Sequence, residues 1–503
     1  MKTPSFRHVY LALALAFLTT PLVVAKPQPN ILFIAVDDWN DWVGCLGHKQ
    51  AITPNLDRLA AGGMLFTNAH CAAPVCNPSR TAVMLGKLPS STGIYNNSHW
   101  WRPAHPEAVT LPAYFRSQGY YVAGAGKLFH HTPGFNDPRA YDTYYFWNPE
   151  VAEAEGWSEN YHHPHWPGLK QKPASPVAHK TKDNFDYAAL DLPEEQLPDT
   201  RVALWAADQL TREHDKPFFL AVGMFRPHLE WYAPRKYFDM YPLNEIRLPR
   251  IKEDDLGDLS PIARKWATVS ASNHTWIRQS GQWPKLIQAY LACISYSDAQ
   301  VGRILDALEA GPHADNTIVV LWSDHGYHLG EKQHWHKFVL WERSTRVPLI
   351  VRVPGMTQPR SQCARPVSLV DLYPTLIDLV GSPDKPSLDG RSIVPLLQNP
   401  ATKWPYPVVC IQEPGNCSVR SEHWRYIRYS DGSEELYNHL SDPDEWTNLA
   451  AKTEYRAVIS DHARWMPRAF APPAPSKDAY RFDPKAFTWI HKQTGKKTNG
   501  REE

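Results

Sequence analysis

The residues best suited to chemistry surround Cys76. Residues 76–80 read Cys-Asn-Pro-Ser-Arg and residues 85–87 read Leu-Gly-Lys. This pattern predicts a helix that begins at Cys76, because proline is tolerated in a first turn and Gly86 can end a helix in the left-handed conformation. At the amino-terminal end of a helix, unpaired N–H groups and the helix dipole favour negative charge. The position suits a reactive sulfur and an anionic substrate, although a buried or disulfide-bonded structural cysteine fits it as well.

Charged side chains also follow four short apolar runs. The runs cover residues 31–36, 121–125, 218–222 and 317–322, and they are followed, in that order, by Asp37-Asp38, by Lys127 with His130, by Arg226 with His228, and by Asp324-His325. Continuous apolar runs of this length are typical of buried parallel strands, and α/β folds place ligand groups at the carboxyl ends of such strands. We therefore expect these side chains to meet above one edge of a sheet.

The adjacent carboxylates Asp37 and Asp38 repel each other, so they need a cation or strong hydrogen-bond donors. Hard oxygen ligands suit calcium or magnesium, and the structural alternative is an Asx turn or a helix cap. Asp324 and His325 mirror this pair, although an imidazole nitrogen is a weaker ligand for a hard cation. The strand-end carboxylates therefore predict a site for a divalent cation.

Helices and further strands must position these groups. Helices are predicted over residues 54–61, with Thr53 as cap, and over residues 200–214 and 284–310. A chain of 503 residues exceeds the length at which a single core usually stops growing, so one large domain and a smaller one are expected. From about residue 404 the pattern changes to short antiparallel strands at 408–411, 424–429 and 435–437. We expect a catalytic domain over residues 26–403 and a smaller subdomain over 404–503.

Composition and the amino terminus limit the classes of function. A net charge of +1 argues against a general nucleic-acid-binding protein. Residues 1–25 have the basic, apolar and small-residue order of a signal peptide, and their apolar run is too short for a comfortable membrane span. We expect a mature chain without a membrane span, in the periplasm or secreted.

The seven cysteines leave six once Cys76 is set aside: Cys45, Cys71, Cys293, Cys363, Cys410 and Cys417. In an exported protein an even number permits bridges, although spacing does not give the connectivity. Cys410 and Cys417 enclose a short Pro-Gly-Asn loop and are the predicted pair.

The motifs together resemble the type I sulfatases. The resemblance rests on Asp37-Asp38, on Cys-x-Pro-Ser-Arg at Cys76, on residues 126–130, on Arg226-Pro227-His228 and on Asp324-His325, in this order. Gly-Lys-x-x-His at residues 126–130 and Asp-His at residues 324–325 are similar to the iduronate-2-sulfatase branch. The resemblance implies an alkaline-phosphatase-like α/β fold, with a mostly parallel central sheet flanked by helices and a smaller C-terminal domain that contains an antiparallel sheet.

The resemblance also implies a role for each motif. Cys76 is oxidised to formylglycine by a maturation enzyme, and the hydrated aldehyde attacks the sulfur of a sulfate ester. The cation, calcium rather than magnesium, is held by Asp37, Asp38, Asp324, His325 and the oxygen of residue 76. Arg80, Lys127 and Lys337 neutralise charge, His228 protonates the leaving alcohol, and His130 is the base that regenerates the aldehyde. His334 and His336, next to Lys337 in the chain, are expected on the substrate side or in solvent.

The implied substrate is a sulfated carbohydrate. The iduronate-2-sulfatase likeness suggests a 2-O-sulfated uronic acid, and Trp100, Trp101, Arg102 and Arg226 are candidates for holding the sugar by stacking and charge. Two alternatives stay open: a phosphomonoester or phosphonate hydrolase on the same fold, and a glycan-binding protein with a dead site.

Overall fold

The computed structural model of the chain describes residues 28–131, 133–145, 175–178, 180, 185–269, 274–383 and 386–499. The predicted signal peptide lies outside these residues. Among the described residues, no helix is long and apolar enough to cross a membrane.

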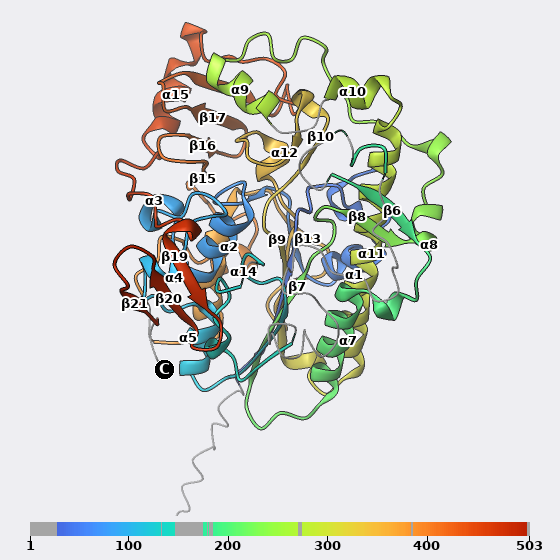
Figure 1. Ribbon diagram of the computed structural model, residues 1–503, viewed down its shortest axis with the longest axis vertical. Helices are drawn as coiled ribbons and strands as arrows, with labels where there is room; N and C mark the ends of the chain where they lie inside the picture. Colours follow the sequence, from blue (N-terminus) through green and yellow to red (C-terminus); the bar gives the residue numbers. More distant parts are fainter. Residues whose placement is uncertain are drawn as a thin grey trace, which may run out of the picture.

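An eight-stranded sheet with the order β13-β2-β12-β9-β1-β7-β4-β5 runs through the molecule (Figure 1). Its strands are β1 (Asn30–Val36), β2 (Met64–Phe66), β4 (Tyr121–Gly126), β5 (Thr143–Tyr145), β7 (Phe218–Met224), β9 (Thr317–Ser323), β12 (Leu349–Arg352) and β13 (Ser361–Cys363). β12 is antiparallel to its neighbours β9 and β2, and the other pairs in the sheet are parallel. The prediction of a mostly parallel α/β sheet is confirmed.

Helices cover both faces of the sheet. Alternate residues of β1 face opposite cores: Leu32, Ile34 and Val36 pack with α1 (Pro54–Ala61), α7 (Pro198–Thr211) and α11 (Trp283–Ala310). Ile31, Phe33 and Ala35 pack with α2 (Cys76–Leu85), α5 (Leu111–Ser117) and α13 (Leu372–Leu379). In Figure 1 the first group lies to the right of the sheet, and α2 and α5 lie to its left. The predicted helices 200–214 and 284–310 correspond to α7 and α11.

Four neighbouring strands end at the same level. Val36 of β1 pairs with Ser323 of β9 and with Met224 of β7, and Gly126 of β4 pairs with Gly223 of β7. Asp37, Asp324, Phe225 and Lys127 therefore follow directly on the last paired residues of adjacent parallel strands. The register alone brings the predicted strand-end groups to one edge of the sheet.

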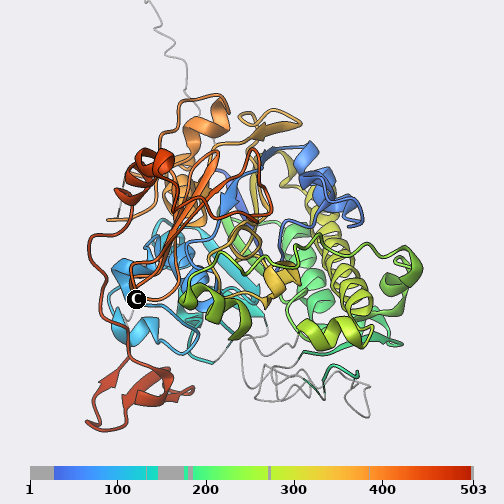
Figure 2. The same ribbon diagram turned by 90° about the horizontal axis from the view of Figure 1, so that it is seen from above.

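A separate four-stranded antiparallel sheet lies near the carboxyl end of the chain. It comprises β15 (Val408–Ile411), β16 (Cys417–Arg420), β17 (Trp424–Arg428) and β18 (Glu434–Asn438), and α15 (Arg456–Ala463) packs on it. Figure 2 shows this sheet apart from the smaller sheet of β19 (Tyr480–Asp483), β20 (Thr488–His491) and β21 (Lys497–Thr498). β16 and the last sheet were not among the predicted strands.

The predicted Cys410–Cys417 disulfide is wrong. All seven cysteines lie in the described ranges, and all are free. Cys417 lies opposite Ile411 in the β15–β16 ladder, and Cys410 lies opposite Ser418. Because neighbouring residues in a strand face opposite sides of a sheet, Cys410 and Cys417 point away from each other. The sulfur of Cys410 instead lies 4.0 Å from that of Cys71.

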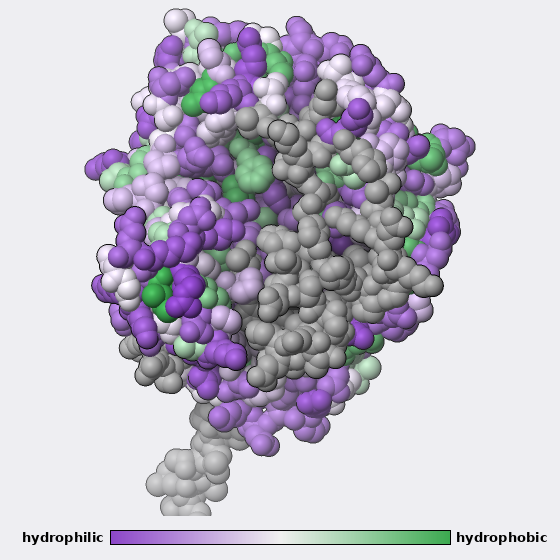
Figure 3. Space-filling view, in the orientation of Figure 1, coloured by the Kyte–Doolittle hydropathy of each residue, from purple (hydrophilic) through white to green (hydrophobic). Residues whose placement is uncertain are grey.

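The remaining elements connect these layers. They are β3 (Ala69–His70), α3 (Pro89–Thr92), α4 (Trp101–Ala104), β6 (Tyr187–Leu190), β8 (Trp231–Pro234), α8 (Arg235–Asp239), α9 (Pro261–Val269), α10 (His274–Gln279), β10 (His328–Leu329), β11 (Trp335–His336), α12 (Glu342–Thr345), β14 (Val367–Ser368) and α14 (Val394–Gln398). The face seen in Figure 1 is hollowed beside α12 and β10, and part of the wall of this hollow is apolar (Figure 3).

Candidate active site

Cys76 is the first residue of α2, as its sequence pattern predicted. Val75 before it is extended, with φ of −151°, and Gly86 ends the helix in the left-handed conformation, with φ of 62°. All residues of α2 are buried, and only 1% of Cys76 is exposed. The cysteine therefore faces the interior from a helix N-terminus, where the helix dipole favours negative charge.

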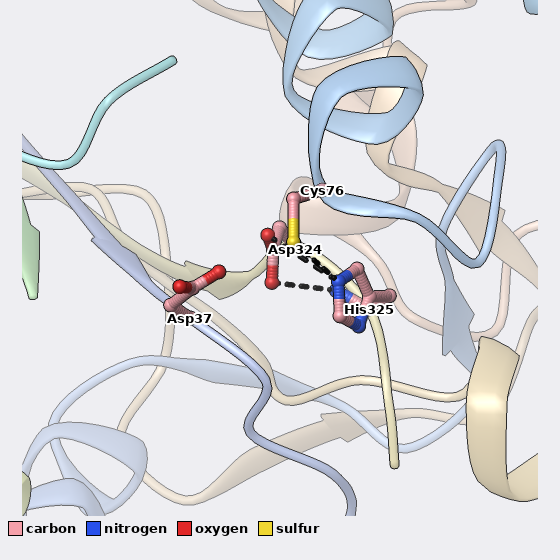
Figure 4. Close-up of side chains that lie close together, drawn as sticks. All are labelled: Asp37, Cys76, Asp324 and His325. Carbon is pink, nitrogen blue, oxygen red and sulfur yellow. Dashed lines mark hydrogen bonds and ion pairs between the residues drawn. The ribbon is translucent and has the colours of Figure 1, made fainter. Parts of the chain in front are cut away.

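The sulfur of Cys76 lies among ionisable groups from three strand ends and one loop. His325 Nε2 and Lys337 Nζ each lie 3.3 Å from Cys76 Sγ. Ligand atoms of Asp37, Cys76, Asp324 and His325 lie within 4.8 Å of one another, and so do those of Asp38, Cys76 and His228. Figure 4 shows Asp37, Asp324 and His325 around the sulfur, which points away from the start of α2. The structure thus brings the predicted metal ligands together.

Arg80 is fully buried and joins two of these carboxylates. Its Nε donates to Asp324 Oδ2 at 2.8 Å, and its Nη2 donates to Asp37 Oδ1 at 3.1 Å. Its Nη1 also donates to the carbonyl oxygens of Lys127 and Leu128. The guanidinium therefore connects the first turn of α2 to the ends of β1, β4 and β9.

Two lysines bring positive charge to the carboxylates and the sulfur. Lys127 Nζ donates to Asp37 Oδ2, and Lys337 Nζ donates to Asp38 Oδ1 at 2.5 Å. Burial alone would raise the pKa of the Cys76 thiol, but Lys127 and Lys337 lower that pKa well below its usual value. Burial, opposed by Arg80, raises the pKa of Asp324 to about 7. The lysines therefore make the site favourable for negative charge at position 76.

The two carboxylate oxygens of Asp38 differ in their contacts. Its Oδ1 is bound by Lys337 and lies 3.3 Å from His325 Nε2. Its Oδ2 is buried and has no hydrogen-bond partner among the residues that the structure describes. Buried polar atoms are rarely left unpaired, and carboxylate oxygens are the ligands that calcium and magnesium prefer. The donor set of Asp37, Asp38 and Asp324, with His325 beside it, fits the divalent cation that the strand-end carboxylates predicted.

The histidines lie at different distances from Cys76. A ring nitrogen of His228 is within 4.8 Å of ligand atoms of Cys76 and Asp38, and His228 Nδ1 lies 2.7 Å from the carbonyl oxygen of Leu229. The ring of His130 packs against His131, with centroids 4.3 Å apart, and the His131 ring lies 6.1 Å from that of His228. His228 is therefore close to Cys76, and the ring of His130 lies beside that of His131, which in turn lies near the ring of His228.

The predicted sugar-binding residues are buried. Trp101 is 0% exposed, donates from Nε1 to the carbonyl oxygen of Phe135 and stacks on Phe129. Trp100 is 4% exposed and stacks on Phe135. These rings present no open face to a sugar.

The two arginines of the predicted sugar site are also buried. Arg102 forms an ion pair with Asp137, with Nη2 and Oδ2 3.1 Å apart. Arg226 donates from Nη1 to the carbonyl oxygen of His228 at 2.8 Å and from Nε to that of Tyr232. These contacts favour a structural role for Arg102 and place Arg226 as a support of the loop that carries His228.

Two residues that support the site have no sequence signal. Asp199 on α7 accepts hydrogen bonds from the backbone N–H groups of Phe225 and Arg226, at 2.9 and 2.8 Å. Tyr290 on α11 donates from its hydroxyl to the carbonyl oxygen of Asp38 at 2.8 Å. Asp199 is the second residue of α7 and Tyr290 lies within α11, and both are distant in sequence from the strand ends they hold, so no local pattern marks them.

Comparison with known proteins identifies the family. The chain matches the family described as Sulfatase over residues 29–382, and the family described as N-sulphoglucosamine sulphohydrolase, C-terminal, over residues 330–468. A protein named Sulfatase from Formosa agariphila is 37% identical over 460 residues, covering 88% of this chain and 87% of its own. Iduronate 2-sulfatase from Homo sapiens is 34% identical over 393 residues, covering 70% of this chain and 69% of its own.

Solved structures agree on the fold. A 2-O GAG sulfatase has a TM-score of 0.65 and 23% identity, covering 87% of this chain and 90% of its own. A phosphonate monoester hydrolase from Silicibacter pomeroyi has a TM-score of 0.71 and 20% identity, covering 87% and 94%. The fold is therefore the expected alkaline-phosphatase-like fold, with a C-terminal antiparallel sheet. Because the Sulfatase family matches most of the chain and close relatives align along most of its length, the chain belongs to the type I sulfatase family and is a sulfuric ester hydrolase.

Proposed function

We propose that this enzyme removes sulfate from a sulfated glycan outside the cytoplasm. The observation that carries the proposal is the position of Cys76, whose sulfur lies 3.3 Å from both Lys337 Nζ and His325 Nε2 at the start of a buried helix. The glycan is supported by relatives that include an iduronate 2-sulfatase and a solved 2-O GAG sulfatase. The location is supported by the signal-peptide pattern of residues 1–25.

Residue 76 acts after its conversion from cysteine to formylglycine by a maturation enzyme. The hydrated aldehyde supplies one hydroxyl that attacks sulfur while the bond between sulfur and the sugar oxygen breaks, and a second hydroxyl whose deprotonation expels sulfate and restores the aldehyde. The sequence around Cys76 and its burial at a helix N-terminus support this role.

A divalent cation completes the site. Asp37, Asp38, Asp324 and His325 would hold it, together with the oxygen of residue 76, and calcium is preferred to magnesium because calcium accepts more carboxylate oxygens in less regular arrangements. The cation supplies positive charge to the sulfate oxygens. The unpaired Oδ2 of Asp38 supports this assignment.

The side chains divide the remaining work. Lys127 and Lys337 offset the charge of the sulfate group, and Arg80 holds Asp37 and Asp324 in place. His228 donates from Nδ1 to the carbonyl oxygen of Leu229, so a second proton on Nε2 is the one given to the departing sugar oxygen. His130 takes the proton that leaves the second hydroxyl of residue 76.

The first substrate to examine is a 2-O-sulfated uronic acid at the end of a glycan chain. The likeness to iduronate 2-sulfatase supports it. A panel of sulfated mono- and disaccharides that differ only in sulfate position identifies the preferred ester by the release of inorganic sulfate.

The decisive experiment joins mass spectrometry of the peptide that contains residue 76 to activity of the same preparation. Protein made with a formylglycine-generating enzyme should carry the aldehyde and release sulfate, and Cys76→Ala should abolish turnover while its circular dichroism is unchanged. Turnover by a preparation with an unmodified thiol would contradict the proposal. Faster hydrolysis of aryl phosphate or phosphonate esters than of aryl sulfate would favour the phosphoryl alternative, and binding without turnover would favour a dead glycan-binding protein.

A further inference from the structure

The segment that delivers Lys337 has an unusual backbone. Lys332, Gln333, His336 and Phe338 have φ values of 51°, 53°, 76° and 76°. Residues other than glycine seldom adopt such values, and those that do gather at functional sites. The segment is placed so that Lys337 Nζ reaches Cys76 Sγ at 3.3 Å. His336 and Phe338 are its immediate neighbours along the chain.

The two histidines of this segment differ in their contacts. His334 lies with Nδ1 2.8 Å from the carbonyl oxygen of Ala267 and with Nε2 2.8 Å from that of Lys337, so it holds the main chain. His336 uses only Nδ1, which lies 2.6 Å from the hydroxyl of Tyr327. The Nε2 of His336 has no hydrogen-bond partner within the described part of the chain, although only 5% of the residue is exposed.

An unpartnered buried nitrogen is unfavourable unless a ligand pairs with it. Burial, helped by the charges of His334 and Lys337, lowers the pKa of His336 to about 3, so the ring is neutral. The residue directly precedes Lys337, whose Nζ lies 3.3 Å from Cys76 Sγ. A neutral imidazole nitrogen suits a hydroxyl group, which can donate or accept, better than it suits an anion.

Phe338 adds an apolar surface on the other side of Lys337. Phe338 is 40% exposed. Its backbone N–H donates to the carbonyl oxygen of Pro74, two residues before Cys76, at 3.1 Å. An open aromatic ring next to a hydrogen-bonding group is suited to a pyranose, which has an apolar face and a hydroxylated edge.

We propose that His336 and Phe338 form a sugar subsite on either side of Lys337. His336 Nε2 hydrogen-bonds a ring hydroxyl next to the sulfate ester, and the Phe338 ring packs against the apolar face of the same sugar. This inference rests on the proposed glycan sulfatase function and identifies residues that select a sugar ester over a sulfate ester without a sugar. It differs from the Trp100, Trp101 and Arg102 set, whose rings stack on Phe135 and Phe129 and whose guanidinium pairs with Asp137.

Two substitutions at His336 separate its two nitrogens. In His336→Asn the amide reaches the position of Nδ1 and keeps the Tyr327 contact, but nothing reaches the position of Nε2. In His336→Gln the longer amide restores a donor near the position of Nε2. Activity is measured on the preferred sulfated saccharide and on 4-nitrophenyl sulfate, which has no sugar hydroxyl. The readout is the ratio of kcat/KM for the saccharide to kcat/KM for 4-nitrophenyl sulfate.

The ratio should fall about 10- to 100-fold in His336→Asn, which corresponds to the loss of one hydrogen bond, and should recover at least partly in His336→Gln. Phe338→Ala should raise KM for the saccharide about tenfold and leave the inhibition constant of inorganic sulfate unchanged. The control Leu440→Ala removes a 72% exposed leucine in the turn after β18, where it has no part in the proposed subsite, and should change neither activity.

An unchanged ratio in His336→Asn, or equal loss on both esters in His336→Asn and His336→Gln, would overturn the subsite. If wild-type enzyme with the aldehyde at residue 76 releases sulfate from neither ester, the proposed function itself fails. If wild-type enzyme desulfates saccharides and the variants keep its selectivity, only the subsite fails.

Discussion

Arg80 shows how one side chain can serve several elements. The sequence pattern presented it as a positive charge for the substrate, but the structure buries it completely between Asp37 and Asp324. Its remaining donors bind main-chain carbonyl oxygens at the end of β4. A planar guanidinium with a fixed set of donors can make these contacts together, and a lysine ammonium cannot.

Arg80→Lys should therefore impair both stability and catalysis. Because two buried carboxylates lose a partner, we expect the free energy of unfolding to fall by about 3–5 kcal/mol. Urea denaturation measures this change, and steady-state kinetics of the folded fraction should show a large loss in kcat. Retention of wild-type stability would show that an ammonium group at position 80 can replace the contacts of Arg80 with Asp37 and Asp324.

At the scale of elements, the strands that end at the site could be predicted because each is a continuous apolar run between polar residues. Side-chain contacts across the fold could not be predicted in the same way. Thr53 precedes α1 as expected, yet its side chain makes no capping hydrogen bond. Asp298 of α11 caps the helix instead, accepting from the N–H groups of Asn55 and Leu56 at 3.2 and 2.9 Å. No pattern near residue 54 contains that information.

Asp298 also gives α1 a pH dependence. Burial, offset in part by the hydrogen bonds from Leu56 and Asn55, raises the pKa of Asp298 from 3.8 to about 6. Between these pH values the folded protein keeps a proton that the unfolded chain has released. The contribution of Asp298 to the free energy of unfolding therefore falls as pH rises, by about 1.4 kcal/mol per pH unit.

The variant Asp298→Asn cannot titrate and should lack this slope. The free energy of unfolding of wild type minus that of the variant should therefore fall as pH rises from 4 to 6. Urea denaturation at several pH values measures it. A difference that does not change with pH would mean that the carboxyl group keeps its ordinary pKa.

At the scale of the whole molecule, the C-terminal sheet supports the catalytic segment. Glu342 of α12 accepts from Arg420 Nε at 3.0 Å and from Arg425 Nη2 at 2.5 Å, and both arginines belong to the four-stranded sheet. Arg425 also donates to the carbonyl oxygen of Leu340 at 2.9 Å. Leu340 and Glu342, which take part in this buried network, follow Lys337 closely in the chain. The sheet therefore holds the segment that contains Lys337, His336 and Phe338.

Glu342→Gln should weaken this connection. Because it removes the carboxylate partner of Arg420 and one of the two carboxylates beside Arg425, the other being Glu445, we expect a loss of about 3–5 kcal/mol in the free energy of unfolding and a lower kcat. The matched control is Glu422→Gln, which removes the half-exposed partner of Arg365 and should change stability by less than about 1 kcal/mol. Equal effects of the two substitutions would argue that the network does not support the site.

The burial of Cys76 sets an order of events in the life of the protein. The residue is 1% exposed and lies in the first turn of a helix that is buried throughout. The segment before this helix is bound by the C-terminal strand β15, because the N–H of Ile411 donates to the carbonyl oxygen of Ala72. A modifying enzyme must reach an extended chain, so the oxidation proposed for residue 76 has to precede folding. Folding would then seal an unmodified cysteine inside the molecule, and a chain that folds too early would be lost to catalysis for as long as it stays folded.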